Sequence, residues 1–170
     1  MKPKAGEYPV YFGTYIAHVI EDDCVLSLEN SEKEILSYLK SIPENNGDDS
    51  YAPGKWTVKQ LIIHISDSER VFAYRAMRFA RGDEQKNLSY EEDDYAANCG
   101  ASERSLQSVI EEFAALRKST ILLYKSFSAK TLQNTGNTTV GITTVNALGF
   151  TISGHAIHHI KVLKERYFKN

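Results

Sequence analysis

The sequence predicts an all-α protein: a four-helix bundle in a single domain, residues 1–170. Four long stretches repeat apolar residues at spacings of three and four, which is typical of amphipathic helices. Short apolar strands do not alternate with these stretches, which argues against a parallel α/β sheet. The chain has 170 residues, 42% of them hydrophobic and 25% charged, and this is enough for one core without disulfides.

An aromatic arm, residues 1–20, precedes the first long helix. Tyr11 and Tyr15 lie four residues apart, so a short helix would present both on one face. The arm either covers the end of the bundle or contributes a tyrosine to a site. Both interpretations remain open from the sequence.

The first two long helices have clear beginnings and ends. One runs from about Asp23 to Ser41, with an aspartate as its N-cap and Pro43 after its end. The next begins after Pro53–Gly54, where Thr57 and the glutamine three residues later form a capping-box pattern, and it ends at Gly82.

Residues 83–101 form a polar stretch that is long for a loop in a small domain. A crossover along the bundle, or a rim over a site, would explain its length. The acidic run 91–94 within it is most simply a solvated face, and it could also cover the mouth of a pocket.

The third helix carries an apolar stripe from Leu106 to Phe127, and Ser102 is its expected N-cap. A short hairpin fits residues 138–144. The fourth helix then runs from residue 143 or 144 to about residue 168. Gly149 and Gly154 weaken it by about 1 kcal/mol each relative to alanine, and their small size would let a neighbouring helix or a ligand come close.

Charge and cysteine content limit the classes of function. Lys and Arg number 20 and Asp and Glu 22, so the net charge of −2 disfavours general binding to nucleic acids or anionic membranes. No apolar stretch reaches the length of a membrane span, and we recognise no export signal. Cys24 and Cys99 are too few for a disulfide scaffold. We therefore expect a cytoplasmic protein with free thiols.

His155 and His159 are the strongest chemical signal. Four residues apart on one helix, they face the same side and can bind one transition-metal ion. The glutamate that follows the first histidine in metalloprotease helices is absent here, so a protease of that type is not supported. His158 points toward the flank and is the poorer ligand. Two histidines packed near the core with backbone partners are the alternative.

His64 makes the metal interpretation stronger. It lies at the edge of the apolar face of the second helix, so three inward-tending histidines would come from two helices. Without a metal, each would need its own hydrogen-bond partner, whereas one ion satisfies all three. Three nitrogen ligands also leave coordination positions open for water and substrate, as catalytic sites do.

Two further residues on the second helix are pocket candidates. Ser68 lies one turn from His64 and could line a pocket with Tyr11 or Tyr15. Glu69 falls at the centre of the apolar stripe, where a carboxylate must be paired or protonated. It is either half of a buried ion pair with an arginine or a group that contacts the metal ligands or the substrate.

Three segments resemble the DinB (damage-inducible) superfamily, which includes YfiT-like metal-dependent hydrolases. They are Pro53-Gly54-Lys55-Trp56-Thr57, the stretch from His64 to Arg70, and Gly154-His155-Ala156-Ile157-His158-His159-Ile160. The similarity spans nearly the whole chain. It implies a four-helix bundle in up-down-down-up order, often a dimer, with His64, His155 and His159 as metal ligands.

The resemblance defines the site better than the reaction. Some members of the superfamily transfer low-molecular-weight thiols to electrophiles, and others have no assigned reaction. We therefore expect an enzyme that acts on a small-molecule substrate, with a zinc or nickel ion, or else manganese or iron, activating water or a thiol. The alternative is a non-catalytic, stress-associated binding protein on a helical scaffold.

Overall fold

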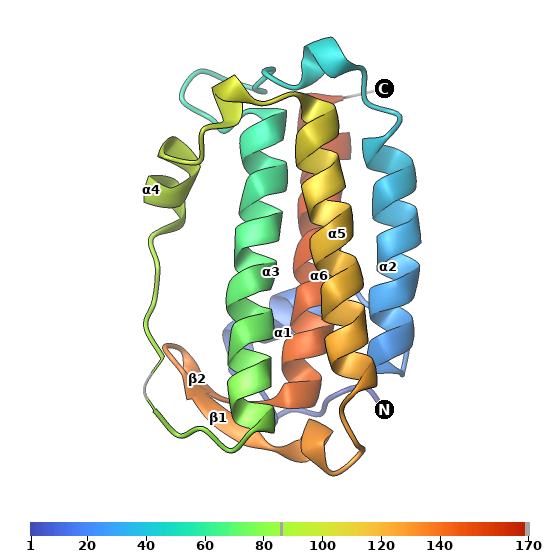
Figure 1. Ribbon diagram of the computed structural model, residues 1–170, viewed down its shortest axis with the longest axis vertical. Helices are drawn as coiled ribbons and strands as arrows, with labels where there is room; N and C mark the ends of the chain where they lie inside the picture. Colours follow the sequence, from blue (N-terminus) through green and yellow to red (C-terminus); the bar gives the residue numbers. More distant parts are fainter. Residues whose placement is uncertain (86, 169–170) are drawn as a thin grey trace.

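Four long helices form a bundle in the computed structural model, which describes residues 1–85 and 87–168 (Figure 1). They are α2 (Cys24–Leu39), α3 (Val58–Ala80), α5 (Leu106–Lys125) and α6 (Val145–Val162). Two short helices, α1 (Val10–Ile16) and α4 (Glu92–Ala97), lie outside the bundle. A hairpin of β1 (Thr135–Thr138) and β2 (Gly141–Thr144) precedes α6, at the place where the sequence predicted one. The fold is therefore the predicted all-α bundle.

The bundle has the order up-down-down-up. In Figure 1, α2 and α6 run upward and α3 and α5 run downward. Both α2 and α3 pack against α5 and α6, so α2 and α3 occupy opposite corners. The polar link after α3 returns along the length of the bundle, and its short helix α4 lies beside α3. Because of this return, α5 begins at the same end of the bundle as α3. The link is thus a crossover along the bundle, which is one of the two explanations expected from its length.

The helix caps match the sequence in all but one place. The side chain of Asp23 caps α2, Thr57 and Gln60 form the predicted capping box, and Thr144 caps α6. The cap of α5 was predicted wrongly. Ser102 lies in a separate 3-10 turn, Ala101–Glu103, and the chain is extended at the next residue, so α5 begins later and Ser105 caps it.

The C-terminal helix ends near the predicted residue in a modified form. The regular α-helix stops at Val162, and a π-helical segment, Leu163–Tyr167, carries the chain on toward Phe168. This places Arg166 and Tyr167 beside the loop that precedes α3, where Tyr167 Oη donates a 2.7 Å hydrogen bond to the carbonyl of Trp56.

A glycine lets α1 pack directly on α6. A Cβ atom added at Gly154 would lie 2.1 Å from the backbone oxygen of Tyr15, which is too close for any larger residue. The sequence predicted this kind of close approach at Gly154. The contact brings the aromatic arm onto the half of α6 that carries the histidines.

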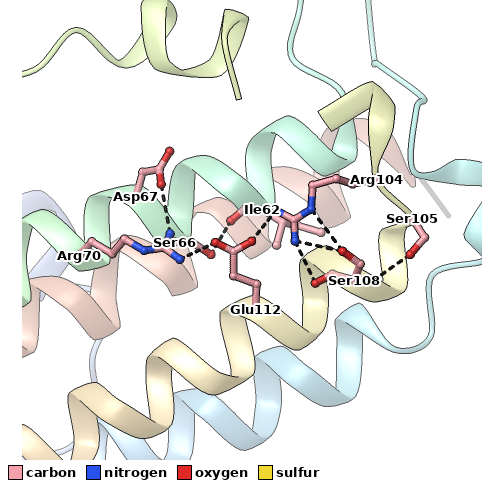
Figure 2. A network of polar contacts seen from close by, with 8 residues as sticks. All are labelled: Ile62, Ser66, Asp67, Arg70, Arg104, Ser105, Ser108 and Glu112. Carbon is pink, nitrogen blue, oxygen red and sulfur yellow. Dashed lines mark hydrogen bonds and ion pairs between the residues drawn. The ribbon is translucent and has the colours of Figure 1, made fainter. Parts of the chain in front are cut away.

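A polar network ties α3 to α5 on the surface (Figure 2). Glu112 of α5 accepts hydrogen bonds from Arg70 of α3 and from Arg104, and Arg70 also contacts Asp67 at 3.1 Å. These arginines lower the pKa of Glu112 although partial burial opposes them. Surface pairs of this kind each contribute about 0.2–1 kcal/mol, so the network supports the parallel α3–α5 contact without dominating its stability.

Within the described ranges, no helix combines the length and the hydropathy that crossing a membrane requires.

Candidate metal centre

The three histidines singled out from the sequence converge between α3 and α6. Nε2 of His155 lies 3.2 Å from Nε2 of His64 and 3.1 Å from Nε2 of His159. One candidate ligand atom from each of the three lies within 4.8 Å of the other two. The spacing of four residues on α6 and the inward position on α3 therefore bring three imidazoles to one point.

Burial keeps these imidazoles neutral. Only 5% of His64 and 4% of His155 are exposed. Loss of hydration lowers the pKa of His64 to about 4 and that of His159 to about 3. Burial, helped by the neighbouring histidines, lowers the pKa of His155 as well. At neutral pH the ring nitrogens thus have lone pairs available for an ion.

Hydrogen bonding alone does not satisfy the cluster. His155 Nε2 faces two other Nε2 atoms, and a single N–H can donate to only one of them. His159 Nδ1 is buried and has no partner among the described residues. A cation that accepts three lone pairs would satisfy the facing nitrogens together, and imidazole is a common ligand of such ions. The donor set therefore fits a bound transition metal.

Aromatic side chains hold the imidazoles in place. The ring centroid of Trp56 lies 4.7 Å from that of His64. Tyr15 and Phe72 meet His155 edge-on at 5.1 and 6.0 Å. These rings come from α1, α3 and the loop before α3, so packing against three segments limits the motion of the imidazoles.

His158 stays outside the cluster, as its position on the helix predicted. Its ring packs against those of Tyr15 at 5.7 Å and His18 at 5.5 Å. It lines a cavity with His159, but it is not among the residues whose nitrogens converge.

One cavity, of about 330 Å³, opens onto the cluster at His155. We call it the tyrosine cavity. Its lining includes three of the four pocket candidates, other residues of α3 and α6, and side chains from the crossover link: Tyr11, Tyr15, Ser68, Phe72, Arg75, Tyr90, Glu91, Glu92 and His155. The structure thus places Tyr11, Tyr15 and Ser68 around the same space.

Two hydroxyl pairs shape the tyrosine cavity. The Tyr11 and Tyr15 hydroxyls lie 2.9 Å apart, and those of Ser68 and Tyr90 lie 2.6 Å apart. Burial raises the pKa of Tyr15 far above its usual range, and it raises that of Tyr90 as well. Both phenols are therefore protonated near neutral pH and can donate hydrogen bonds. The Tyr90 contact also fastens the crossover link to α3.

A second cavity, of about 430 Å³, opens onto the cluster at His159. We call it the tryptophan cavity. Its walls come from the loop before α3, from α3, α4 and α6, and from the π-helical segment: Tyr51, Gly54, Lys55, Trp56, Leu61, Asp93, His158, His159, Val162, Arg166 and Tyr167. The acidic run thus contributes to both cavities, Glu91 and Glu92 to one and Asp93 to the other.

Glu69 is the pocket candidate that the structure places elsewhere. It does not belong to the lining of either cavity. Its oxygens accept hydrogen bonds of 2.8–3.0 Å from Arg117 of α5, and both side chains are buried. A carboxylate in an apolar stripe needs such a partner, so the structure shows the buried ion pair that was one of the two interpretations of Glu69.

Sequence reasoning missed several wall residues. Trp56 and Lys55 belong to a motif that carried the family resemblance, but no role was inferred for them. Tyr90 lies in an irregular segment with no periodicity to orient it. Arg166 reaches the tryptophan cavity through the π-helical turn, which helical spacing does not predict.

Comparison with known proteins identifies relatives of similar length. The family model described as DinB superfamily matches residues 27–163. A Bacillus mycoides (strain KBAB4) protein, named as a candidate metal-dependent hydrolase, is 24% identical over 166 residues, which cover 94% of this chain and 95% of that protein.

Solved structures share the architecture. YfiT from Bacillus subtilis, described as a probable metal-dependent hydrolase with an unusual four-helix bundle topology, matches with a TM-score of 0.70 and 19% identity over 100% of this chain and 95% of its own. A mycothiol-dependent maleylpyruvate isomerase matches with a TM-score of 0.68 and 13% identity, over 81% of this chain and 58% of its own. At these identities the structural matches establish the fold.

Proposed function

The chain belongs to the DinB superfamily, and on this premise we propose that it is a metal-dependent enzyme whose ligands are His64, His155 and His159. The observation that carries the proposal is the convergence of three neutral, buried imidazoles with Nε2 atoms 3.1 and 3.2 Å apart. The names of the Bacillus mycoides and Bacillus subtilis relatives support a metal-dependent reaction.

A divalent ion bound by imidazoles lowers the pKa of an adjacent water or thiol and so supplies a nucleophile near neutral pH. Zinc or nickel suits this donor set best, and manganese or iron is also compatible with it. The protein contributes a rigid setting. Trp56 packs against His64, and Phe72 and Tyr15 meet the ring of His155 edge-on, so the imidazoles are held in place.

The nucleophile is either water or a low-molecular-weight thiol. The structural match to a mycothiol-dependent enzyme favours a thiol, and the hydrolase names favour water. Two cavities open onto the cluster at different histidines, an arrangement that suits a reaction in which two molecules meet at one centre. On that observation we favour thiol transfer to an electrophile.

Metal content tests the centre first. Untagged protein should contain about one equivalent of a transition metal by elemental analysis, and His64→Ala or His155→Ala should lose most of it. His18→Ala is the matched control, because His18 is a half-buried histidine outside the cluster. Equal metal content in all four proteins would refute the assignment of the ligands.

The reaction class is tested with reagents that report both outcomes. Metal-loaded protein is incubated with 1-chloro-2,4-dinitrobenzene and 2-mercaptoethanol, and separately with p-nitrophenyl acetate in the absence of thiol. Thiol transfer predicts metal-dependent conjugate formation with release of chloride, whereas hydrolysis predicts metal-dependent release of p-nitrophenol. If neither product forms faster than with chelated protein, the result favours the non-catalytic binding protein.

A further inference from the structure

The tryptophan cavity presents two cationic side chains beside an aromatic wall. Lys55 and Arg166 both line it and both are exposed to solvent. The Arg166 guanidinium lies 5.6 Å from the centroid of the Tyr51 ring and donates a 3.4 Å hydrogen bond to its hydroxyl. Neither cation forms an ion pair with another residue of the described chain. Their charges therefore remain available to a ligand.

The fixed charge of this cavity is positive. Asp93 of α4 is an acidic side chain in the same lining, so the two cations leave an excess of one positive charge at neutral pH. Charges that line a concave surface raise the local concentration of ligands of the opposite sign. An anion is therefore favoured on this side of the histidines.

The tyrosine cavity has the opposite character. Glu91 and Glu92 both line it. Its one arginine, Arg75, is only 6% exposed and already donates a 2.7 Å hydrogen bond to the carbonyl of Leu88. The two routes to the cluster thus differ in charge, and the route past His159 is the one suited to an anionic molecule.

We propose that the tryptophan cavity recognises a small anionic substrate whose carboxylate-class group binds Lys55 and Arg166 while its reacting end reaches the histidine cluster. The inference rests on the proposed function, because it assumes an ion at that cluster. Trp56, which lines the same cavity and packs against His64, offers an apolar surface for the body of the molecule.

Thiols that differ only in their far end test this proposal. The protein is loaded with cobalt(II), and binding is followed by the absorption that appears when a thiolate coordinates cobalt. The probes are mercaptoalkanoates of two to six carbons, with the mercaptoalkanols and aminoalkanethiols of the same lengths. At the best length the acid should bind roughly fivefold more tightly than the alcohol, and the amine should bind most weakly. High salt should reduce the preference.

Variants test whether Lys55 and Arg166 cause the preference for the acid over the alcohol. Lys55→Gln with Arg166→Gln should remove it, whereas Asp93→Asn should increase it. Arg81→Gln with Lys118→Gln is the matched control, since it removes the same charge from exposed residues outside both cavity linings and should keep the preference.

Two kinds of failure are distinguishable. Protein that does not retain cobalt contradicts the metal centre and hence the proposed function. Cobalt-loaded protein that binds acid and alcohol equally at every length, or that binds no thiol, overturns the anionic-substrate proposal alone. A preference that survives in the double glutamine variant overturns it too.

Discussion

Arg117 and Glu69 form a fully buried ion pair that joins α5 to α3. The guanidinium donates hydrogen bonds of 2.8–3.0 Å to both carboxylate oxygens and a further one, of 2.8 Å, to Ser31 of α2. The exposed fractions of the two side chains are 0% and 2%. Three of the four bundle helices thus share one polar contact in the core.

Removing one partner should be far worse than removing both. Arg117→Met leaves a buried, unpaired carboxylate and should lower the free energy of unfolding by about 3–5 kcal/mol. The double variant Arg117→Met with Glu69→Leu should recover much of this loss, because no charge is left buried. Urea unfolding followed by circular dichroism measures both. A double variant as unstable as the sum of the two single variants would contradict this prediction.

The cap of α5 gives a sharper test of where this helix begins. Ser105 Oγ accepts a hydrogen bond from the Ser108 backbone N–H at 3.1 Å (Figure 2). Ser105→Ala should therefore cost about 1 kcal/mol of stability. Ser102→Ala is the matched control and should change stability by less than about 0.5 kcal/mol. Reversed values in thermal unfolding would restore Ser102 as the cap.

Long periodic helices and their spacing could be predicted from the sequence because local chemistry decides them. The capping box at Thr57 and the pairing of His155 with His159 depend on residues three or four apart. The cap at Ser105 could not be distinguished from one at Ser102, because both are serines ahead of the same stripe. Only the 3-10 turn, set by packing, separates them.

The candidate site also has a part that the sequence predicted, the three histidines, and a part that it did not, the residues of the cavity walls. Three inward histidines on two helices were enough to predict that they meet, whereas Trp56 and Arg166 reach the site through loop and π-helical geometry. Glu69 shows what the helical spacing of residues cannot predict. The spacing correctly indicated that Glu69 is buried, but it could not identify its partner, Arg117, which is 48 residues away in the sequence. Long-range partners of this kind depend on tertiary packing.

Gly154 should be essential for seating α1. In Gly154→Ala the new methyl group would lie 2.1 Å from a backbone oxygen of α1, so either helix must shift. We expect a loss of about 1–3 kcal/mol. Gly13→Ala serves as the control, since its Cβ would meet only the Tyr8 side chain, at 3.3 Å, and it should be nearly neutral. Equal thermal stability of the two variants would argue against the tight contact.

Metal-free protein should lose stability as the pH falls from about 6.5 to 4. In the folded state burial lowers the pKa of His64 to about 4 from the 6.5 of an exposed histidine. Between these values the unfolded chain binds the proton and the folded chain does not, so acid favours unfolding. The shift corresponds to a loss on the order of 3 kcal/mol for this residue.

The variant His64→Gln isolates that contribution. Denaturant unfolding at pH 7 and pH 4.5, in the presence of chelator, should show a smaller difference in unfolding free energy for the variant than for the wild type. His18→Gln is the control, because it removes a histidine that is only half-buried and lies outside the cluster. Identical pH dependence in all three proteins would mean that His64 is hydrated in solution.

Trp56 should report metal binding directly. It is the only tryptophan in the chain, and its ring centroid lies 4.7 Å from that of His64. Cobalt or nickel ions have unfilled d shells and quench nearby indole emission, whereas zinc, with its filled shell, does not. Titration with nickel should therefore quench most of the fluorescence with a stoichiometry of about one, and added zinc should reverse the quenching by competing for the site.

His155→Ala should abolish the response, whereas His18→Ala should retain it. Unchanged emission in protein that elemental analysis shows to be nickel-loaded would place the ion away from the three imidazoles.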